Sequence, residues 1–359
     1  MSRRRIIKPD GSFDSLFNKA LDFELKQTNL PYVPGDLTEE KRIRFRVSGS
    51  PFCTYKFLFS VYEVISDSRM WDLGGDFFCG IGTSAHSTFQ RWIALANPGR
   101  VLGNWRCLHC CENPYEHECI SCKTKCKAYK QALVGPQICP ICGRYMTYEE
   151  FSFVFPDIPV TGHCDGVLIE DPSQLLGVEL SQDNCYAVDK LLRRDLDKKI
   201  DAYILEYKTS TRSKATIINE PQPEHKAQAS MYVYRANEDF PLLYGLKGIN
   251  IKGAIVKYIS RDIPQIRSRD ILFDVTDGGD FYEYNKKIVK RTLKAFKSGD
   301  AELLELPRLP CRGKYGNYYS TCPFMHSCSD LKQYAQEFLD KSRKKVLKSW
   351  SNFNKQFRS

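Results

Sequence analysis

Residues Thr161–Leu168 carry the sequence TGHCDGVL, and the interpretation of the whole chain begins with this segment. Its apolar residues indicate a strand, and Asp165 lies between glycines that let the backbone turn. Further along, Ile204–Thr209 carry ILEYKT, a second apolar segment that contains an acid, Glu206. The two segments predict two strands, each of which bears a carboxylate.

The second strand also places a lysine close to its acid. Residues two apart on a strand share a face, so Glu206 and Lys208 point the same way. Leu205 and Tyr207 then point into the opposite layer. Together with Asp165, these residues predict two carboxylates and one ammonium that converge on one cleft.

This combination of groups has a specific chemistry. Hard oxygen ligands suit Mg²⁺ or Mn²⁺, which keep waters and substrate phosphate in their coordination shell. A bound metal lowers the pKa of a water and offsets charge on a scissile phosphate, and a lysine can orient or deprotonate the attacking water. The predicted reaction is phosphodiester hydrolysis. An isolated Glu-x-Lys is more often a solvated pair on a strand surface, so the prediction depends on further motifs.

Two further motifs flank these strands. Upstream, GTSAHSTFQ at Gly82–Gln90 places His86 on a predicted helix that opens with glycine. Downstream, HKAQASMY at His225–Tyr232 places Gln228 and Tyr232 four residues apart, on one face of a predicted helix.

The ordered motifs G-x-x-x-H, G-x-x-D, E-x-K and Q-x-x-x-Y resemble those of the RecB-like branch of the PD-(D/E)xK nucleases, over Ser48 to Asp330 outside a cysteine-rich segment. The resemblance implies a restriction-endonuclease-like α/β core, with a mixed central sheet flanked by helices. It implies that the ligands of Mg²⁺ or Mn²⁺ are His86, Asp165, Glu206 and the main-chain carbonyl of Tyr207. It implies that the catalytic residues are Asp165, Glu206, Lys208, Gln228 and Tyr232. Among these, Lys208 is the catalytic lysine, and Gln228 with Tyr232 holds the lysine, the metal shell or the DNA backbone in place.

Strands and helices alternate along the chain, which by itself predicts an α/β core. Strands are expected at residues 151–155, 162–169, 202–208, 249–260 and 270–275. Helices are expected at residues 82–95, 224–235 and 282–298.

Three features depart from the family pattern. The connection from Asp165 to Glu206 is longer than the usual hairpin, so we expect an extra helix over residues 186–197. Within it, Glu179 in GVELS imitates the third motif, but Ser181 stands where the lysine should be, and Glu206 is preferred. His163 could face the site, although a structural hydrogen bond is the favoured role.

Fifteen cysteines are too many for ordinary packing, and an odd number in a reducing compartment favours metal sites over disulfides. Eight of them fall within 36 residues. Two C-x-x-C knuckles, Cys107/Cys110 and Cys139/Cys142, indicate a structural zinc ribbon. A second zinc site would use Cys111, Cys119, Cys122 and Cys126, with His109 and His117 as reserve ligands. How the eight cysteines divide between one or two zinc ions stays open.

The cysteine-rich segment, residues 101–148, is polar and is predicted to be an inserted module held together by metal. Its basic residues make a DNA-gripping role plausible; they are Lys123, Lys125, Lys127, Lys130 and Arg144. A pure scaffold or a protein-docking surface is the alternative.

A second, looser group of cysteines joins distant parts of the chain. One early thiol, Cys53, and three late ones, Cys311, Cys322 and Cys328, could hold an iron–sulfur cluster that clasps the domain. The arrangement is similar to that of the CRISPR-associated exonucleases and the AddB-type nucleases, which implies a 4Fe-4S cluster. Those families place the second cysteine where this chain has Tyr319, so Cys311 is an inference. The alternatives are a zinc site with the same ligands or unrelated buried thiols. The remaining thiols, Cys79, Cys164 and Cys185, are expected to be buried or idle.

Charge and hydropathy indicate the kind of partner and the location of the protein. The formal net charge is +10, which favours a polyanionic partner. There is neither an apolar stretch long enough for a membrane span nor the apolar block of a signal peptide, so the expected location is the cytoplasm of a bacterial or phage-infected cell. Residues 341–359 hold seven Lys or Arg and no acid. They are expected to form a basic arm or helix on a phosphate backbone, or else a solvated terminal helix.

The expected organisation is an N-terminal extension (1–47), the nuclease core (48–100 and 149–330), the inserted zinc module (101–148) and the basic C-terminal part (331–359). The resemblance implies a metal-dependent exonuclease on single-stranded DNA or DNA ends, working in replication, recombination or repair with other proteins of these processes. The alternative is a non-catalytic DNA-binding subunit whose nuclease core is a scaffold. Redox sensing through the cluster would be compatible with either function.

Overall fold

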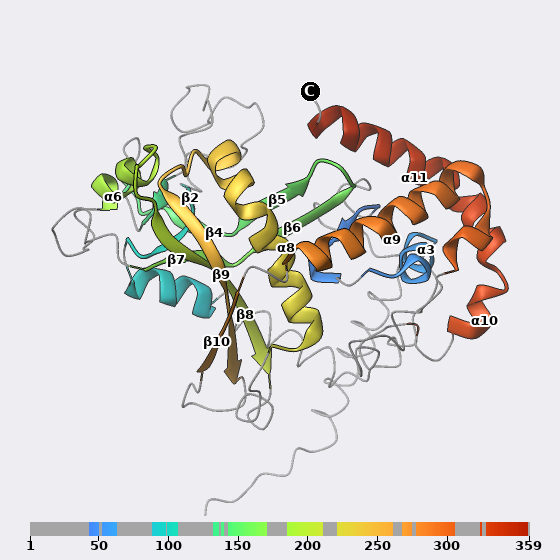
Figure 1. Ribbon diagram of the computed structural model, residues 1–359, viewed down its shortest axis with the longest axis horizontal. Coiled ribbons are helices and arrows are strands. Elements are labelled where there is room, and N and C mark those ends of the chain that lie inside the picture. Colours follow the sequence, from blue (N-terminus) through green and yellow to red (C-terminus); the bar gives the residue numbers. More distant parts are fainter. Residues whose placement is uncertain are drawn as a thin grey trace, which may run out of the picture.

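The protein is described by a computed structural model, in which two β-sheets are flanked by helices (Figure 1). The structure describes residues 43–49, 52–62, 88–97, 99–106, 132–135, 138–139, 143–170, 185–210, 221–260, 268–274, 278–305, 324 and 328–357. The fold class is α/β, as the alternation of elements predicted.

The larger sheet has seven strands in the order β10-β9-β8-β7-β2-β3, with β4 paired to β2. Its strands are β2 (Val101–Arg106), β3 (Ala132–Val134), β4 (Thr147–Glu149), β7 (Gly166–Ile169), β8 (Ile200–Ser210), β9 (Ile249–Ser260) and β10 (Ser268–Asp274). β2, β7 and β8 are antiparallel neighbours, whereas β9 is parallel to β8. A parallel pair needs a crossover connection, which the helix α8 provides. The central sheet is therefore mixed.

A smaller sheet has three strands in the order β1-β6-β5. These strands are β1 (Phe45–Arg46), β5 (Phe151–Phe155) and β6 (Val160–Cys164). The single strand expected at residues 162–169 is thus two strands, β6 in the smaller sheet and β7 in the larger one, with Asp165 at the break. The break has a physical cause: the carbonyl oxygen of Asp165 accepts hydrogen bonds from the Gln90 and Tyr148 side chains, so it is not available for strand pairing.

The expected helices are present, with shifted ends. The helices are α3 (Thr54–Val61), α6 (Cys185–Leu192), α8 (Pro223–Asp239), α9 (Gly278–Ser298), α10 (Cys328–Lys332) and α11 (Ala335–Phe357), and residues 88–96 are also helical. Shorter turns of helix are η1 (Val47–Gly49), η4 (Phe240–Tyr244) and η6 (Ala301–Leu304). α6 is the extra helix predicted between the two acidic strands. None of the helices in the described ranges is both long and apolar enough to cross a bilayer.

Helices α3, α9 and α11 pack together beyond the smaller sheet (Figure 1). Aromatic rings fill their contact, since Trp350 of α11 stacks on Phe57 of α3 and meets Phe296 of α9 edge-on. The Trp350 indole also donates to the carbonyl of Ile43 at 2.9 Å. The basic C-terminal part is therefore a long helix docked on the core.

Apolar side chains fill two layers, one on each face of the larger sheet. The main core contains Ile204, and the second, smaller cluster contains Leu205, Tyr207 and Trp105. This division confirms that Leu205 and Tyr207 face the layer opposite to Glu206, whose side chain bonds to α8.

The central sheet extends into the range assigned to the inserted module. β2 and β3 are buried strands, with Val101, Leu102 and Trp105 in β2 at most 1% exposed. β4 pairs with β2 through Trp105 and Tyr148. Strands this short and buried on both faces leave no alternating pattern in the sequence, so boundaries drawn at residues 101 and 148 cut through the sheet. Residues 107–131 lie outside the described residues.

Candidate active site

The two predicted acids lie opposite each other: Glu206 is on β8, and Asp165 directly precedes the neighbouring strand β7. Gly166 pairs with Leu205 in the β7–β8 ladder, and extending this antiparallel register by one residue places Asp165 across from Glu206. Both acids are buried, each with 3% of its surface exposed. Buried carboxylates are costly unless they are paired or bind a cation.

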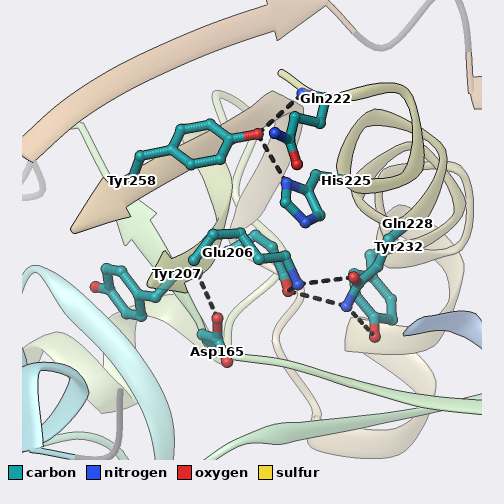
Figure 2. Close-up of polar contacts among 9 residues, drawn as sticks. Asp165, Glu206, Tyr207, Gln222, His225, Gln228, Tyr232 and Tyr258 are labelled. Atoms are coloured by element: carbon teal, nitrogen blue, oxygen red, sulfur yellow. Dashed lines mark hydrogen bonds and ion pairs between the residues drawn. The ribbon is translucent and has the colours of Figure 1, made fainter. Parts of the chain in front are cut away.

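Glu206 belongs to a closed network with the predicted lysine and glutamine, and Figure 2 shows the Glu206, Gln228 and Tyr232 side chains of this network. Lys208 Nζ donates to Glu206 Oε1 at 2.7 Å and to Gln228 Oε1 at 2.9 Å. Gln228 Nε2 donates in turn to Glu206 Oε1 at 2.9 Å and to the Tyr232 hydroxyl at 3.3 Å. Both ends of the amide are thus used, which fixes its orientation. Four side chains that the sequence placed on β8 and α8 meet as predicted.

The protonation of this network follows from its burial and charge. Burial alone would lower the pKa of Lys208, but the Glu206 carboxylate and its hydrogen bond outweigh burial and raise that pKa above its ordinary value. Burial and the charge of Glu206 raise the pKa of Tyr232 well above 10. Lys208 is therefore an ammonium and Tyr232 a neutral phenol at ordinary pH. In this arrangement the Lys208 ammonium donates to both Glu206 and Gln228.

Asp165 is held differently, through its backbone and by residues from other elements. Its Oδ2 accepts the Tyr207 backbone N–H at 2.5 Å, and its carbonyl oxygen accepts from Gln90 Nε2 at 2.9 Å. The Tyr148 hydroxyl donates to the same carbonyl oxygen. We call the Gln90 and Tyr148 side chains the Asp165 clamp. Tyr207, whose main-chain carbonyl the resemblance implies as a ligand, follows Glu206 on β8 and donates its N–H to Asp165.

Sequence reasoning missed both clamp residues. Gln90 carried a weak signal, because it ends the quoted histidine motif and lies in the helical residues 88–96. Tyr148 carried none, because it comes from the range assigned to the inserted module. Its ring reaches Asp165 only through the pairing of β4 with β2 and of β2 with β7.

The chain bends at Asp165, as expected, and the two glycines near it also provide space. Neither is among the described glycines with positive φ. A Cβ at Gly166 would lie 2.4 Å from the Tyr148 hydroxyl oxygen, and a Cβ at Gly162 would lie 2.8 Å from the Tyr232 ring. Each glycine therefore lets a tyrosine ring lie against its strand.

The fourth implied metal ligand, His86, lies outside the described residues, as do Glu179 and Ser181. No group of three or more His, Cys, Asp or Glu side chains suitable for a metal occurs in the described ranges. There the candidate metal centre is the pair of carboxylates, Asp165 and Glu206.

Two other histidines have structural partners. His163 is exposed on β6, and its ring nitrogen Nδ1 lies 3.1 Å from the Ser152 hydroxyl of β5, which confirms the favoured structural role. His225, at the start of α8, was quoted in the glutamine motif but given no role. Its Nδ1 lies 2.8 Å from the Tyr258 hydroxyl, beside the Glu206 network (Figure 2).

Two of the four predicted iron–sulfur ligands lie in the same region as Tyr55. Burial and Glu305 raise the pKa of the Tyr55 phenol, and Cys53, which caps α3, and Cys328, which begins α10, add smaller contributions. Phe324 packs edge-on against Phe59 of α3. The structure thus brings the early and late cysteine segments to one region, while Cys311, Cys322 and Tyr319 lie outside the described residues.

Of the eight clustered cysteines, only Cys139 is described. It is buried, and its carbonyl oxygen accepts the Gly143 N–H at 2.9 Å, where Gly143 has a φ of 69°. Outside the described residues lie Cys107, Cys110, Cys111, Cys119, Cys122, Cys126, Cys142, His109 and His117. The leftover thiols Cys164 and Cys185 are fully buried, as expected, and Cys79 is not described.

Comparison of the chain with models of protein families, with curated proteins and with solved structures finds no match. The site therefore has to be interpreted from its own geometry.

Proposed function

We propose that this protein is a metal-dependent deoxyribonuclease of the RecB-like PD-(D/E)xK type, acting as an exonuclease on single-stranded DNA or DNA ends. One observation carries the proposal. Two buried carboxylates, Asp165 and Glu206, face each other across adjacent strands, and the ammonium of Lys208 is held beside them by Gln228. A structural ion pair on a sheet needs neither the second buried acid nor the amide that orients the lysine.

The donor set fits a divalent cation. Two carboxylates and one ammonium leave a net negative charge in a buried place, which favours Mg²⁺ or Mn²⁺ with hard oxygen ligands. Asp165, Glu206 and the Tyr207 carbonyl would hold the metal, with His86 as the further ligand that the resemblance implies. When bound, such an ion activates water and offsets charge on the scissile phosphate.

The protein's own residues would then orient the reacting groups. Lys208 can then donate to the attacking water or to a phosphate oxygen. Gln228 holds the Lys208 ammonium in one position, and Tyr232 holds Gln228. The Asp165 clamp holds the backbone of Asp165, and with it the Asp165 carboxylate, in a fixed position.

A basic helix supports DNA as the partner. On α11, Lys344 and Lys348 are exposed, and within the described part of the chain neither forms an ion pair. They lie four residues apart on the face opposite to the buried Trp350 and Phe353. Such a face suits a phosphate backbone. The 4Fe-4S cluster at Cys53, Cys311, Cys322 and Cys328 and the zinc sites of the cysteine-rich segment belong to the same proposal, as structural cofactors.

The proposal is tested by digesting 5′- and 3′-labelled single- and double-stranded DNA with Mn²⁺, with iron and zinc determined on the same sample. Wild-type protein should release nucleotides from ends, and Asp165→Ala should release none while keeping its iron and zinc. DNA binding without cleavage in Mg²⁺, Mn²⁺ and Co²⁺ would replace the proposal with the alternative, a non-catalytic DNA-binding subunit of a recombination or nuclease complex.

A further inference from the structure

The start of α8 carries a histidine that borders the Glu206 network without being part of it. His225 Nδ1 lies 2.8 Å from the hydroxyl of Tyr258 on β9. The same hydroxyl accepts the backbone N–H of Gln222 at 2.9 Å. In Figure 2 the His225 ring lies between Tyr258 on one side and Glu206 with Gln228 on the other.

These hydrogen bonds determine which ring nitrogen of His225 carries the proton. Tyr258 is only 1% exposed, so its hydroxyl proton needs an acceptor inside the protein. Within the described residues, the acceptor within bonding distance is His225 Nδ1. If Nδ1 carried the proton instead, the buried Tyr258 hydroxyl would have no acceptor, a costly arrangement. Nδ1 therefore accepts, and the proton of the neutral ring is on Nε2.

Nε2 is the part of the ring that remains available. Among the described residues it has no hydrogen-bond partner, and the His225 side chain is partly exposed. Burial and the nearby charge of Lys208 lower the pKa of His225 to about 3, so the ring is neutral at ordinary pH. A neutral ring with its proton on Nε2 has no lone pair there, so it is a donor and not a metal ligand.

We propose that His225 is a substrate-binding residue whose Nε2–H donates to a non-bridging phosphate oxygen of the nucleic-acid backbone, beside the Lys208 ammonium. This inference rests on the proposed function, because it names a contact of the same site with its substrate. An anionic oxygen accepts a shorter and stronger hydrogen bond from such an N–H than a neutral acceptor does. Tyr258 and Gln222 are positioning residues. The Gln222 N–H donates to the Tyr258 hydroxyl, which donates in turn to His225 Nδ1, and these bonds fix the ring and its tautomer.

Three substitutions separate this role from a structural one. His225→Gln keeps an N–H donor near the place of Nε2, whereas His225→Asn keeps only a group near Nδ1, and His225→Ala keeps neither. With a 5′-labelled single-stranded oligonucleotide in Ca²⁺, His225→Ala and His225→Asn should each bind about tenfold more weakly than wild type. His225→Gln should recover most of the loss. In Mn²⁺ the loss should appear in KM, with kcat nearly unchanged.

A direct readout is the ¹⁵N spectrum of the His225 ring in the full chain, titrated with inorganic phosphate. We expect the Nε2–H tautomer and a phosphate-dependent shift at Nε2, and Tyr258→Phe should give a mixture of tautomers. An Nδ1–H tautomer in wild type, or equal oligonucleotide binding by wild type and His225→Asn, would overturn the inference. Neither measurement requires cleavage. A protein that binds DNA through His225 but cuts nothing would therefore remove the proposed nuclease function and leave this inference standing.

Discussion

The Glu206 end and the Asp165 end of the site are held in place by different kinds of contact. At the Glu206 end, side chains of β8 and α8 bond to one another, and the partners are between 2 and 22 residues apart in sequence. At the Asp165 end, the Asp165 clamp bonds to a main-chain carbonyl, and Gln90 lies 75 residues away. The first end is built from one strand and the helix that follows it, while the second depends on three segments meeting. In the proposed function, the first end would supply the groups that react, and the second end would hold its acid in position.

The largest effect is expected at the Glu206 end. Lys208→Ala removes the ammonium that we place next to the reacting phosphate, so Mn²⁺-dependent cleavage should fall about 10³-fold or more. Lys252→Ala is the matched control, because Lys252 is an exposed lysine of β9 paired with Asp201.

Cleavage rates and thermal melting should be measured on both lysine variants. Should Lys208→Ala fail to fold, because Glu206 loses its partner, Lys208→Gln keeps a donor toward Glu206 and tests the same point. Wild-type rates in a folded Lys208 variant would remove the lysine from the reaction.

The next effect is expected at Gly166, on the Asp165 side. Gly166→Ala puts a methyl group 2.4 Å from the Tyr148 hydroxyl oxygen, so it should displace the ring, destabilise the protein by about 1–3 kcal/mol and lower activity. Tyr148→Phe removes the clashing oxygen, so Gly166→Ala should cost less in that background. Denaturant unfolding of the two single variants and the double variant gives the coupling free energy. Additive changes in the free energy of unfolding would show that Gly166 is not needed to make room for the Tyr148 ring.

Tyr148→Phe alone should have a smaller effect. One of two donors to the Asp165 carbonyl is lost, and a net cost of about 1–3 kcal/mol for an under-satisfied buried carbonyl predicts weaker Mn²⁺ binding and an activity loss of about tenfold. Tyr145→Phe is the control, since Tyr145 is 67% exposed on the same segment. Wild-type behaviour of both tyrosine variants would contradict the role of the Tyr148 hydroxyl in holding Asp165.

The smallest effect is expected for Gln90→Ala. Gln90 shares its acceptor with Tyr148, so its removal leaves the carbonyl with one donor, and activity should fall about two- to fivefold. Combined with Tyr148→Phe, the loss should exceed the product of the single losses, because the carbonyl would then have no side-chain donor. Steady-state rates of the two single variants and the double variant measure this; a simple product would mean that the two donors act independently.

The sequence predicted the contacts at the Glu206 end of the site better than those at the Asp165 end. Glu206 and Lys208 share a face because they are two apart on a strand, and Gln228 and Tyr232 are stacked because they are four apart on a helix. Such spacing is local and can be read before the fold is known. The same holds for β5, β9 and α8, whose apolar patterns are long enough to be unambiguous.

The contacts of the Asp165 clamp were not predictable from the sequence. The Asp165 clamp exists because β4 pairs with β2 and β2 with β7, and no local pattern encodes that order. The break between β6 and β7 follows from the same contacts, since it is the clamp that occupies the Asp165 carbonyl. The sequence grouped Cys53 with Cys328 as cluster ligands, and the family resemblance supported the same grouping, but neither indicated that both would lie near Tyr55.

The central claim is that Asp165 and Glu206 together hold one divalent cation beside Lys208. Mn²⁺ binding, followed by electron paramagnetic resonance on wild type, Asp165→Asn and Glu206→Gln, tests it most directly. We predict one Mn²⁺ site in wild type that is lost or strongly weakened in each variant, with iron and zinc content unchanged. Equal Mn²⁺ binding by all three proteins would contradict the claim.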